Sequence, residues 1–353
     1  MSDDRIESRL VLAIVRERWD EVDAICARET PDADALLRVG RGCDVEPWLH
    51  ARLHAAGRLR TVGERAAERL GEARRKCRAD NLLLLARLEQ ALDVLRGRDI
   101  VPVVLKGVAV LHQFDVGFDE RRLDDVDFLV ARRDFEASVE ALRDAGWTSP
   151  PEREPRRWLG ESFEESLLSP GPVPVLFDVH SHIAQRPRYR VEIEDVLSRT
   201  VEITVAGRAA LRLEDHDQAA HVLLHHVQHY FDRRLKWAID FRSIAAQNGF
   251  DWERLGRRLA EWGGTSAGAM SLRHIHKLLP EAVPPEALAA IPVARWRRWI
   301  TGPLRSGHPL DLFRGTRRRA VQLYLGAALV EDPRQLAAAF LHRPAAPRPD
   351  PPG

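Results

Sequence analysis

The sequence of 353 residues has little of several features that mark particular classes of protein. Its three cysteines, Cys26, Cys43 and Cys77, are odd in number and lack Cys-x-x-Cys spacing, so we expect reduced structural thiols, with a redox role as the alternative. No apolar run reaches the roughly 18 residues of a membrane span. Residues 1–10 lack the apolar core of a signal peptide. The sequence therefore predicts a cytoplasmic protein without a membrane partner.

The chain also lacks a surplus of charge of either sign. Its 54 Lys and Arg residues nearly cancel 53 Asp and Glu residues, which leaves a net charge of +1. We therefore expect no general affinity for nucleic acid. Lysine itself is scarce, so a lysine at a chemically suggestive position is informative. The four lysines are Lys76, Lys106, Lys236 and Lys277.

Hydrophobic periodicity divides the chain into parts. Residues 1–95 repeat apolar side chains at helical spacing, residues 96–213 mix short apolar runs with helical stretches, and residues 214–343 are helical again. The tail, residues 344–353, is half proline and is expected to be disordered. The sequence predicts an α+β protein, with a small mixed-sheet core flanked by helical N- and C-terminal domains.

Within the core, buried β-branched runs and turn signals predict the order of elements. The turn Ser169-Pro170-Gly171-Pro172 indicates a β-hairpin. The expected strands are residues 100–105, 126–130, 162–168, 173–180, 201–205 and 209–213, and the expected helices are residues 108–114, 134–145 and those from 215 onward.

Three carboxylates in this core form the strongest chemical signal. Asp125 and Asp127 lie two residues apart in a strand, so both project from one face. Asp178 lies in a second apolar strand, with His180 two residues further on and on the same face. Carboxylates this close repel each other, and a divalent cation with a preference for oxygen ligands would compensate. An isolated Asp-x-Asp is also common in turns and helix entries, so the combination carries the argument.

The order of these motifs resembles the bacterial family of uncharacterised nucleotidyltransferases, which belongs to the polymerase-β-type superfamily. The resemblance covers roughly residues 80–245. Its matching features are Asn81 before the helix 82–96, residues 100–107 ending in Leu105-Lys106-Gly107, Arg121 or Arg122, residues 125–130, Gly146-Trp147, residues 177–180, and Leu235-Lys236-Trp237 with Asp240. One departure from the wider superfamily is Lys-Gly-Val in place of a Gly-Gly or Gly-Ser turn.

The resemblance implies a Mg²⁺-dependent (or Mn²⁺-dependent) transfer of a nucleoside monophosphate from an NTP to an acceptor hydroxyl or phosphate, with release of pyrophosphate. The acceptor could be a small molecule, a peptide, a protein or an RNA. The implied catalytic and metal-binding residues are Asp125, Asp127 and Asp178. The implied nucleotide-binding residues are Lys106, Gly107, Arg121, Arg122, His180, Lys236 and Asp240.

Several alternatives remain open at this stage. A metal-dependent sugar transferase also uses Asp-x-Asp, and a non-catalytic nucleotide-binding or partner protein could keep the fold. Lys236 and Asp240 could form an exposed pair four residues apart on a helix. The stripe His221, His225 and His229, with His226 beside it, could bind zinc, line the cleft or hydrogen-bond within a packed interface.

Overall fold

The structure is a computed structural model that describes residues 5–113, 117–151, 156–158, 161–184, 188–229, 235–247 and 249–291, together with 293, 329 and 331. The expected helices beyond residue 293 and the proline-rich tail lie outside the described residues, and the boundaries between domains stay predictions. No helix in the described part is long and apolar enough to cross a membrane.

The N-terminal part is helical, as the periodicity predicts. Its elements are α1 (Arg5–Val15), α2 (Trp19–Arg28), α3 (Ala33–Gly42), α4 (Glu46–Ala55), the short 3₁₀ helix η1 (Leu59–Val62) and the long α5 (Glu64–Arg96). Asp32 caps α3 by accepting a hydrogen bond from the backbone N–H of Ala35. Leu36, Leu49 and Leu53 are fully buried where these helices pack together.

The core is a mixed seven-stranded sheet in the order β3-β4-β5-β2-β1-β7-β6. β2 runs parallel to β5, and β1 runs antiparallel to β2 and parallel to β7. β4 and β5 form the antiparallel hairpin that the turn predicts. The strands are β1 (Val103–Val104), β2 (Val126–Leu129), β3 (Arg156–Trp158), β4 (Glu161–Leu168), β5 (Leu176–His180), β6 (Val201–Val205) and β7 (Arg208–Arg212); the helical segments between them are α6 (Lys106–Gln113), η2 (Arg132–Asp134), α7 (Phe135–Asp144) and α8 (Ile193–Leu197).

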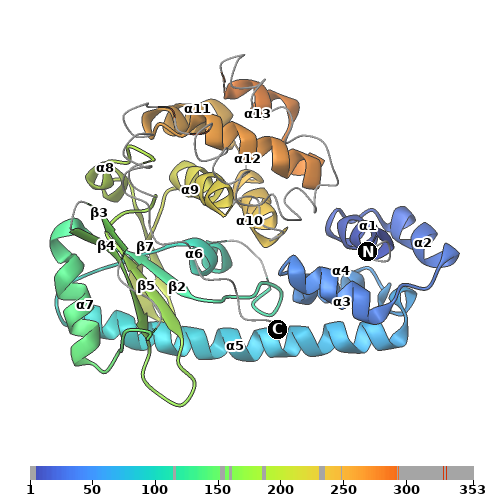
Figure 1. Cartoon of the computed structure of the whole chain (residues 1–353), viewed down its shortest axis with the longest axis horizontal. Coiled ribbons are helices and arrows are strands. Elements are labelled where there is room, and N and C mark those ends of the chain that lie inside the picture. The colour runs from blue at the N-terminus through green and yellow to red at the C-terminus, as the bar shows by residue number, and fades with distance from the viewer. Residues whose placement is uncertain are drawn as a thin grey trace.

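The two faces of the sheet carry different side chains. On one face, Val126, Phe128 and Phe177 pack in one apolar cluster with residues of α5 and α7. The Phe177 ring lies 5.8 Å from that of Phe128 and 6.0 Å from that of Trp147. Figure 1 shows α5 along the lower edge of the molecule, beneath the sheet and the N-terminal helices. The other face carries the polar residues of the site.

The C-terminal part is helical in its described residues. α9 (Asp215–Gln228) contacts α10 (Leu235–Ala245), α11 (Trp252–Glu261) and α12 (Thr265–Leu278), and η3 (Pro280–Ala282) and α13 (Pro285–Ala290) follow. Figure 1 places these helices on the side of the sheet away from α5. The α+β architecture, a mixed sheet with helical flanks, is therefore confirmed.

The first strand is shorter than expected, and the following helix is longer. Only Val103–Val104 of the run 100–105 is a strand, and α6 begins at Lys106 instead of residue 108. Pro102 has no backbone N–H to give to a ladder, although its carbonyl accepts from Leu211. Ile100 donates back to the Leu95 carbonyl, so it closes the end of α5.

Two buried histidines between α9 and α12 give a pH-dependent stability. Burial lowers the pKa of His274 to about 3, with a further contribution from the charge of Lys277. Burial also lowers the pKa of His226, whose ring lies 5.2 Å from that of His274. Because both pKa values lie below the unfolded value, the unfolded chain takes up protons first as the pH falls below about 6.5.

We therefore predict that the free energy of unfolding falls between pH 6.5 and pH 4 by up to ~1.4 kcal/mol per pH unit for each of the two histidines. The variant His274→Gln lacks one of these two proton-binding side chains. Its free energy of unfolding should therefore fall less steeply with pH, by up to ~1.4 kcal/mol per pH unit. Urea denaturation at several pH values measures the two slopes. Identical slopes for the wild type and the variant would contradict the prediction.

Candidate functional site

The register of two neighbouring strands brings two carboxylates together. In the parallel pair β2 and β5, Asp127 lies opposite Asp178, and Leu129 lies opposite His180. Side chains at paired positions point to the same face, so Asp127 and Asp178 are direct neighbours. The apolar cluster on the opposite face, which includes Phe128 and Val179, fixes this register.

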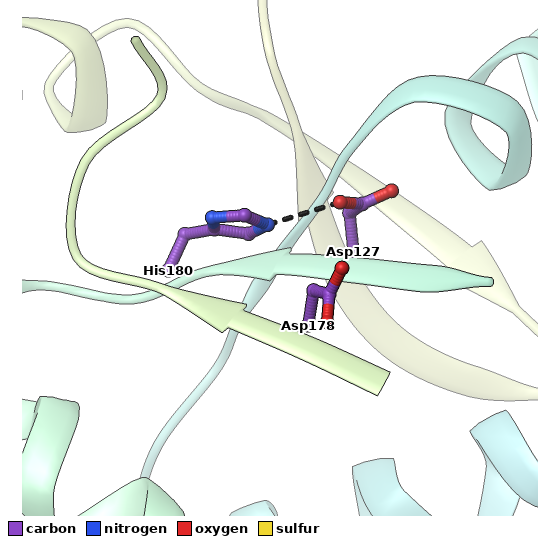
Figure 2. A group of neighbouring side chains, drawn as sticks. All are labelled: Asp127, Asp178 and His180. Atoms are coloured by element: carbon purple, nitrogen blue, oxygen red, sulfur yellow. Dashed lines mark hydrogen bonds and ion pairs between the residues drawn. The ribbon is translucent and has the colours of Figure 1, made fainter. Parts of the chain in front are cut away.

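Asp127, Asp178 and His180 form a group of the size that holds a metal ion. One ligand atom of each lies within 4.8 Å of the others, and all three residues are buried. Figure 2 shows the three side chains on the same side of the two strands, with His180 directed at Asp127. Ligand atoms that share one ion lie within a few ångströms of each other, as these do. The donor set therefore fits a divalent cation that prefers oxygen.

Asp127 is the most strongly bonded member of this group. Its Oδ1 accepts from Lys106 Nζ at 2.5 Å and from His180 Nε2 at 2.9 Å. The other ring nitrogen of His180 lies 3.6 Å from the Glu164 carboxylate. Asp178 accepts a hydrogen bond of 2.6 Å from Ser166 Oγ. Lys106 and His180 thus both bond to the same oxygen of Asp127.

The pKa values of Asp125, Asp127 and Asp178 shift in opposite directions. Burial raises the pKa of Asp127, but the charge of Lys106 and the hydrogen bond from His180 outweigh it and hold that pKa well below its usual range. Burial, together with the charge of Asp127, raises the pKa of Asp125 to about 6 and also raises that of Asp178. Burial and the charge of Asp127 therefore disfavour the ionised forms of Asp125 and Asp178.

His180 gains its proton affinity from the same contacts. Burial lowers its pKa, but the hydrogen bond to Asp127 and the charge of Glu164 outweigh burial, and the net pKa is raised. The hydrogen bond from the ring orients the Asp127 carboxylate, as hydrogen-bonding partners of ligand carboxylates commonly do.

The turn after β1 places Lys106 and Gly107 beside this group. Lys106 adopts a left-handed backbone conformation, with φ of 49° at the start of α6, which is uncommon for a residue other than glycine. Such conformations cluster at functional sites. Gly107 allows a close approach, because a Cβ atom there would lie 2.5 Å from Nη1 of Arg121.

Arg121 and Asp240, both expected at the nucleotide, bond to each other. Nε and Nη2 of Arg121 donate to the two oxygens of Asp240 at 2.7 Å each, and both side chains are buried. Nη1 of Arg121 donates to the Arg122 carbonyl. The side chain of Arg122 is half-exposed and pairs with Asp124 at 3.2 Å. The described geometry thus gives Arg121 a role in joining the core to α10.

Lys236 is buried and does not form the exposed pair with Asp240 that we considered. Its Nζ bonds to Asp124 of the core and lies 3.4 Å from Asp44, which follows α3. This alternative does not hold, because Lys236 and Asp240 each bond to a residue far away in the chain. Lys236 therefore joins α10 to the residue that precedes Asp125.

The histidine stripe divides between two environments. His221 is buried, and the charges of Lys106, Asp127 and His180 act on it, while burial lowers its pKa to about 3. His225 and His229 pack against Trp237 at 4.8 and 5.1 Å. His226 shares a hydrogen bond of 2.9 Å with Ser271. Among the described residues, no group with metal-ligand spacing includes this stripe.

Sequence reasoning missed Glu164 and Ser166. Both lie on β4 and face β5, where Glu164 is paired with His180 and Ser166 with Asp178. Two features of the sequence pointed to them: Glu164 and Ser166 are two residues apart in a predicted strand, and a predicted hairpin turn follows that strand. Pairing the strands outward from that turn would have placed both beside the carboxylates.

A mixed sheet with two paired carboxylates is the arrangement expected of a nucleotidyltransferase core. Asp125, the third predicted carboxylate, precedes β2 and is not in the group of Asp127, Asp178 and His180, although the charges of Asp127 and Lys106 act on it. The family model of the uncharacterised nucleotidyltransferases matches residues 29–280 of the chain. The protein therefore belongs to this nucleotidyltransferase family, and the match begins well before the residues that carry the motif resemblance. No match to a curated protein was found.

The buried pair of Arg121 and Asp240 yields a prediction about stability. Asp240→Asn leaves the Arg121 guanidinium buried without its charge partner, so we expect the free energy of unfolding to fall by about 3–5 kcal/mol. Replacing both residues, with Arg121→Met and Asp240→Leu, should recover much of that loss.

The control for this measurement is the exposed pair of Arg98 and Asp144, which are 3.2 Å apart. Asp144→Asn should cost much less, because exposed ion pairs contribute little. Urea denaturation of the four proteins gives the comparison. A loss in Asp240→Asn as small as that in Asp144→Asn would show that the buried pair has no such role.

Proposed function

We propose that the protein is a divalent-metal-dependent nucleotidyltransferase. It transfers a nucleoside monophosphate from an NTP to an acceptor hydroxyl or phosphate and releases pyrophosphate. The observation that carries this proposal is the in-register pair of Asp127 and Asp178 on neighbouring parallel strands, in a chain of this family. Asp125, two residues before Asp127, supplies the third carboxylate.

Asp125, Asp127 and Asp178 are the residues that would hold Mg²⁺ or Mn²⁺. Their oxygen donors suit these hard cations better than imidazole would, which leaves His180 to orient Asp127. The raised pKa values of Asp125 and Asp178 support this assignment, because burial and the charge of Asp127 disfavour the ionised carboxylates, which a bound cation would stabilise. A bound divalent cation supplies charge neutralisation at the phosphates and brings the reacting oxygens together.

In the transfer, an acceptor oxygen attacks the α-phosphorus, and the bond from that phosphorus to the bridging oxygen of pyrophosphate breaks. The bridging oxygen keeps the electron pair. Asp178 accepts the proton of an attacking hydroxyl, and its raised pKa suits it to that task. Positioning and charge neutralisation provide most of the acceleration in reactions of this type.

Lys106 and the start of α6 form the proposed phosphate site. The ammonium of Lys106 lies beside Asp127, and α6 begins at that residue. The N-terminus of a helix offers unpaired N–H groups and a partial positive charge to an anion. Gly107 and the half-exposed Arg122 belong to the same proposed surface. Arg121 and Asp240 support it through their ion pair, and Lys236 supports it through its bond to Asp124.

One prediction of the proposed function concerns binding of the metal and the nucleotide. ATP or another NTP should raise the melting temperature only in the presence of Mg²⁺ or Mn²⁺, because ligands that bind the native state stabilise it by mass action. Asp178→Asn and Asp125→Asn should each remove most of the shift, since each deletes one ligand charge at nearly constant shape.

Asp144→Asn is the matched control, because Asp144 lies on the exposed surface of the same core. It should keep the shift of the wild type. A shift that survives in Asp178→Asn would remove this carboxylate from the metal site.

Another prediction of the proposed function distinguishes a nucleotidyltransferase from a sugar transferase. With each NTP labelled at the α-phosphate and a metabolite extract as acceptor, label should move to an acceptor and pyrophosphate should appear in equal amount. Asp178→Asn should abolish both products. A sugar transferase would need a nucleotide sugar and would release a nucleoside diphosphate. Metal-dependent NTP binding without any product, over all four NTPs, would favour a non-catalytic nucleotide-binding protein.

A further inference from the structure

The segment between α6 and β2 leads directly into the proposed metal site. Its described part, residues 117–125, forms turns and irregular backbone before β2 begins at Val126. It carries Arg121, Asp124 and Asp125, whose positions decide the geometry of the site. An irregular segment has no ladder of its own, so its conformation depends on bonds to other elements.

Asn81 of α5 supplies such bonds to the backbone of this segment. The side chain is fully buried, and its Nδ2 donates to the carbonyls of Phe118 at 2.8 Å and Arg121 at 2.9 Å. Its Oδ1 accepts from the Leu123 N–H at 3.0 Å. A carboxamide is the side chain that offers two donors and an acceptor at one carbon, so an aspartate of the same shape cannot make all three bonds.

Two arginines of the N-terminal helices hold the side chains of the same segment. Arg74 of α5 donates to Asp119 at 3.0 Å, and Arg52 of α4 donates to Glu120 at 2.6 Å. These ion pairs are partly exposed, whereas the contacts of Asn81 are buried or nearly so. Buried hydrogen bonds to backbone fix a segment more tightly than partly exposed ion pairs do.

We propose that Asn81 is a positioning residue for Asp125. By holding the backbone of Leu123, two residues before Asp125, it fixes the path of the irregular segment that carries Asp125 to the start of β2. This inference rests on the proposed function, because it assigns Asp125 a place at the metal ion.

The test is Mn²⁺ binding, measured from the signal of free Mn²⁺ in electron paramagnetic resonance. Asn81→Asp and Asn81→Ser should weaken Mn²⁺ binding by about 10-fold or more, the usual effect of removing a residue that orients a metal ligand. Gln90→Glu is the matched control, because it changes an exposed amide of the same helix into an isosteric carboxylate. It should bind Mn²⁺ as the wild type does.

A double variant distinguishes positioning from a general loss of stability. If Asn81 acts through Asp125, Asn81→Ser combined with Asp125→Asn should bind Mn²⁺ no more weakly than Asp125→Asn alone. Additive losses would overturn the inference, as would wild-type Mn²⁺ affinity in the Asn81 variants. A wild-type protein that binds no Mn²⁺ would instead overturn the proposed function, and the inference with it.

Hydrogen exchange provides a second measurement on the same proteins. The amides of residues 118–125 should exchange faster in Asn81→Ser than in the wild type or in Gln90→Glu, and unchanged exchange would also overturn the inference. If both Asn81 variants fail to fold, Arg74→Gln loosens the same segment from its partly exposed side. It should weaken Mn²⁺ binding by a smaller factor, and wild-type affinity in that variant would count against the inference.

Discussion

The repulsion between the carboxylates of Asp127 and Asp178 is the interaction on which the arrangement of the surrounding residues depends. The strand register that pairs them is fixed by apolar side chains on the opposite face, so the two acids cannot separate without loss of the core. Lys106 and His180 relieve the repulsion most directly at Asp127, to which both bond. The ammonium of Lys106 reaches this carboxylate from a residue in an uncommon backbone conformation.

Long-range ion pairs then connect the carboxylates to the helical parts on either side. Arg121 joins the core to α10 through Asp240, and Lys236 of α10 reaches back to Asp124 and to Asp44. Arg121, Asp240 and Lys236 carry charge, yet they are buried, where an unpaired charge is costly. Each pair therefore tends to hold its two elements in a single relative position. The site lies where the core, the N-terminal helices and the C-terminal helices meet.

Much of the fold could be predicted from sequence, because local periodicity determines it. The hairpin and the mixed sheet follow from spacing within single elements, and the family was recognised from motifs within about 165 residues. Partners such as Arg121 and Asp240 lie 119 positions apart, so no local pattern pairs them. Lys236 illustrates this limit: helical spacing left a pair with Asp240 open, but the folded chain gives each residue a different partner. Side-chain partners in a compact core depend on tertiary packing, which one sequence does not display.

The long helix α5 affects how the protein unfolds. Its 33 residues extend about 50 Å at the usual rise, and it contacts α3 and α4 near its start and α7 and β7 further along. There is thus no flexible hinge between the N-terminal helices and the sheet. Removing the residues before Glu64 would expose Ala66 and Leu70 of its first turns to water. The N-terminal helices and the sheet should therefore unfold as one cooperative unit, because both pack against α5 and its loss would disrupt both.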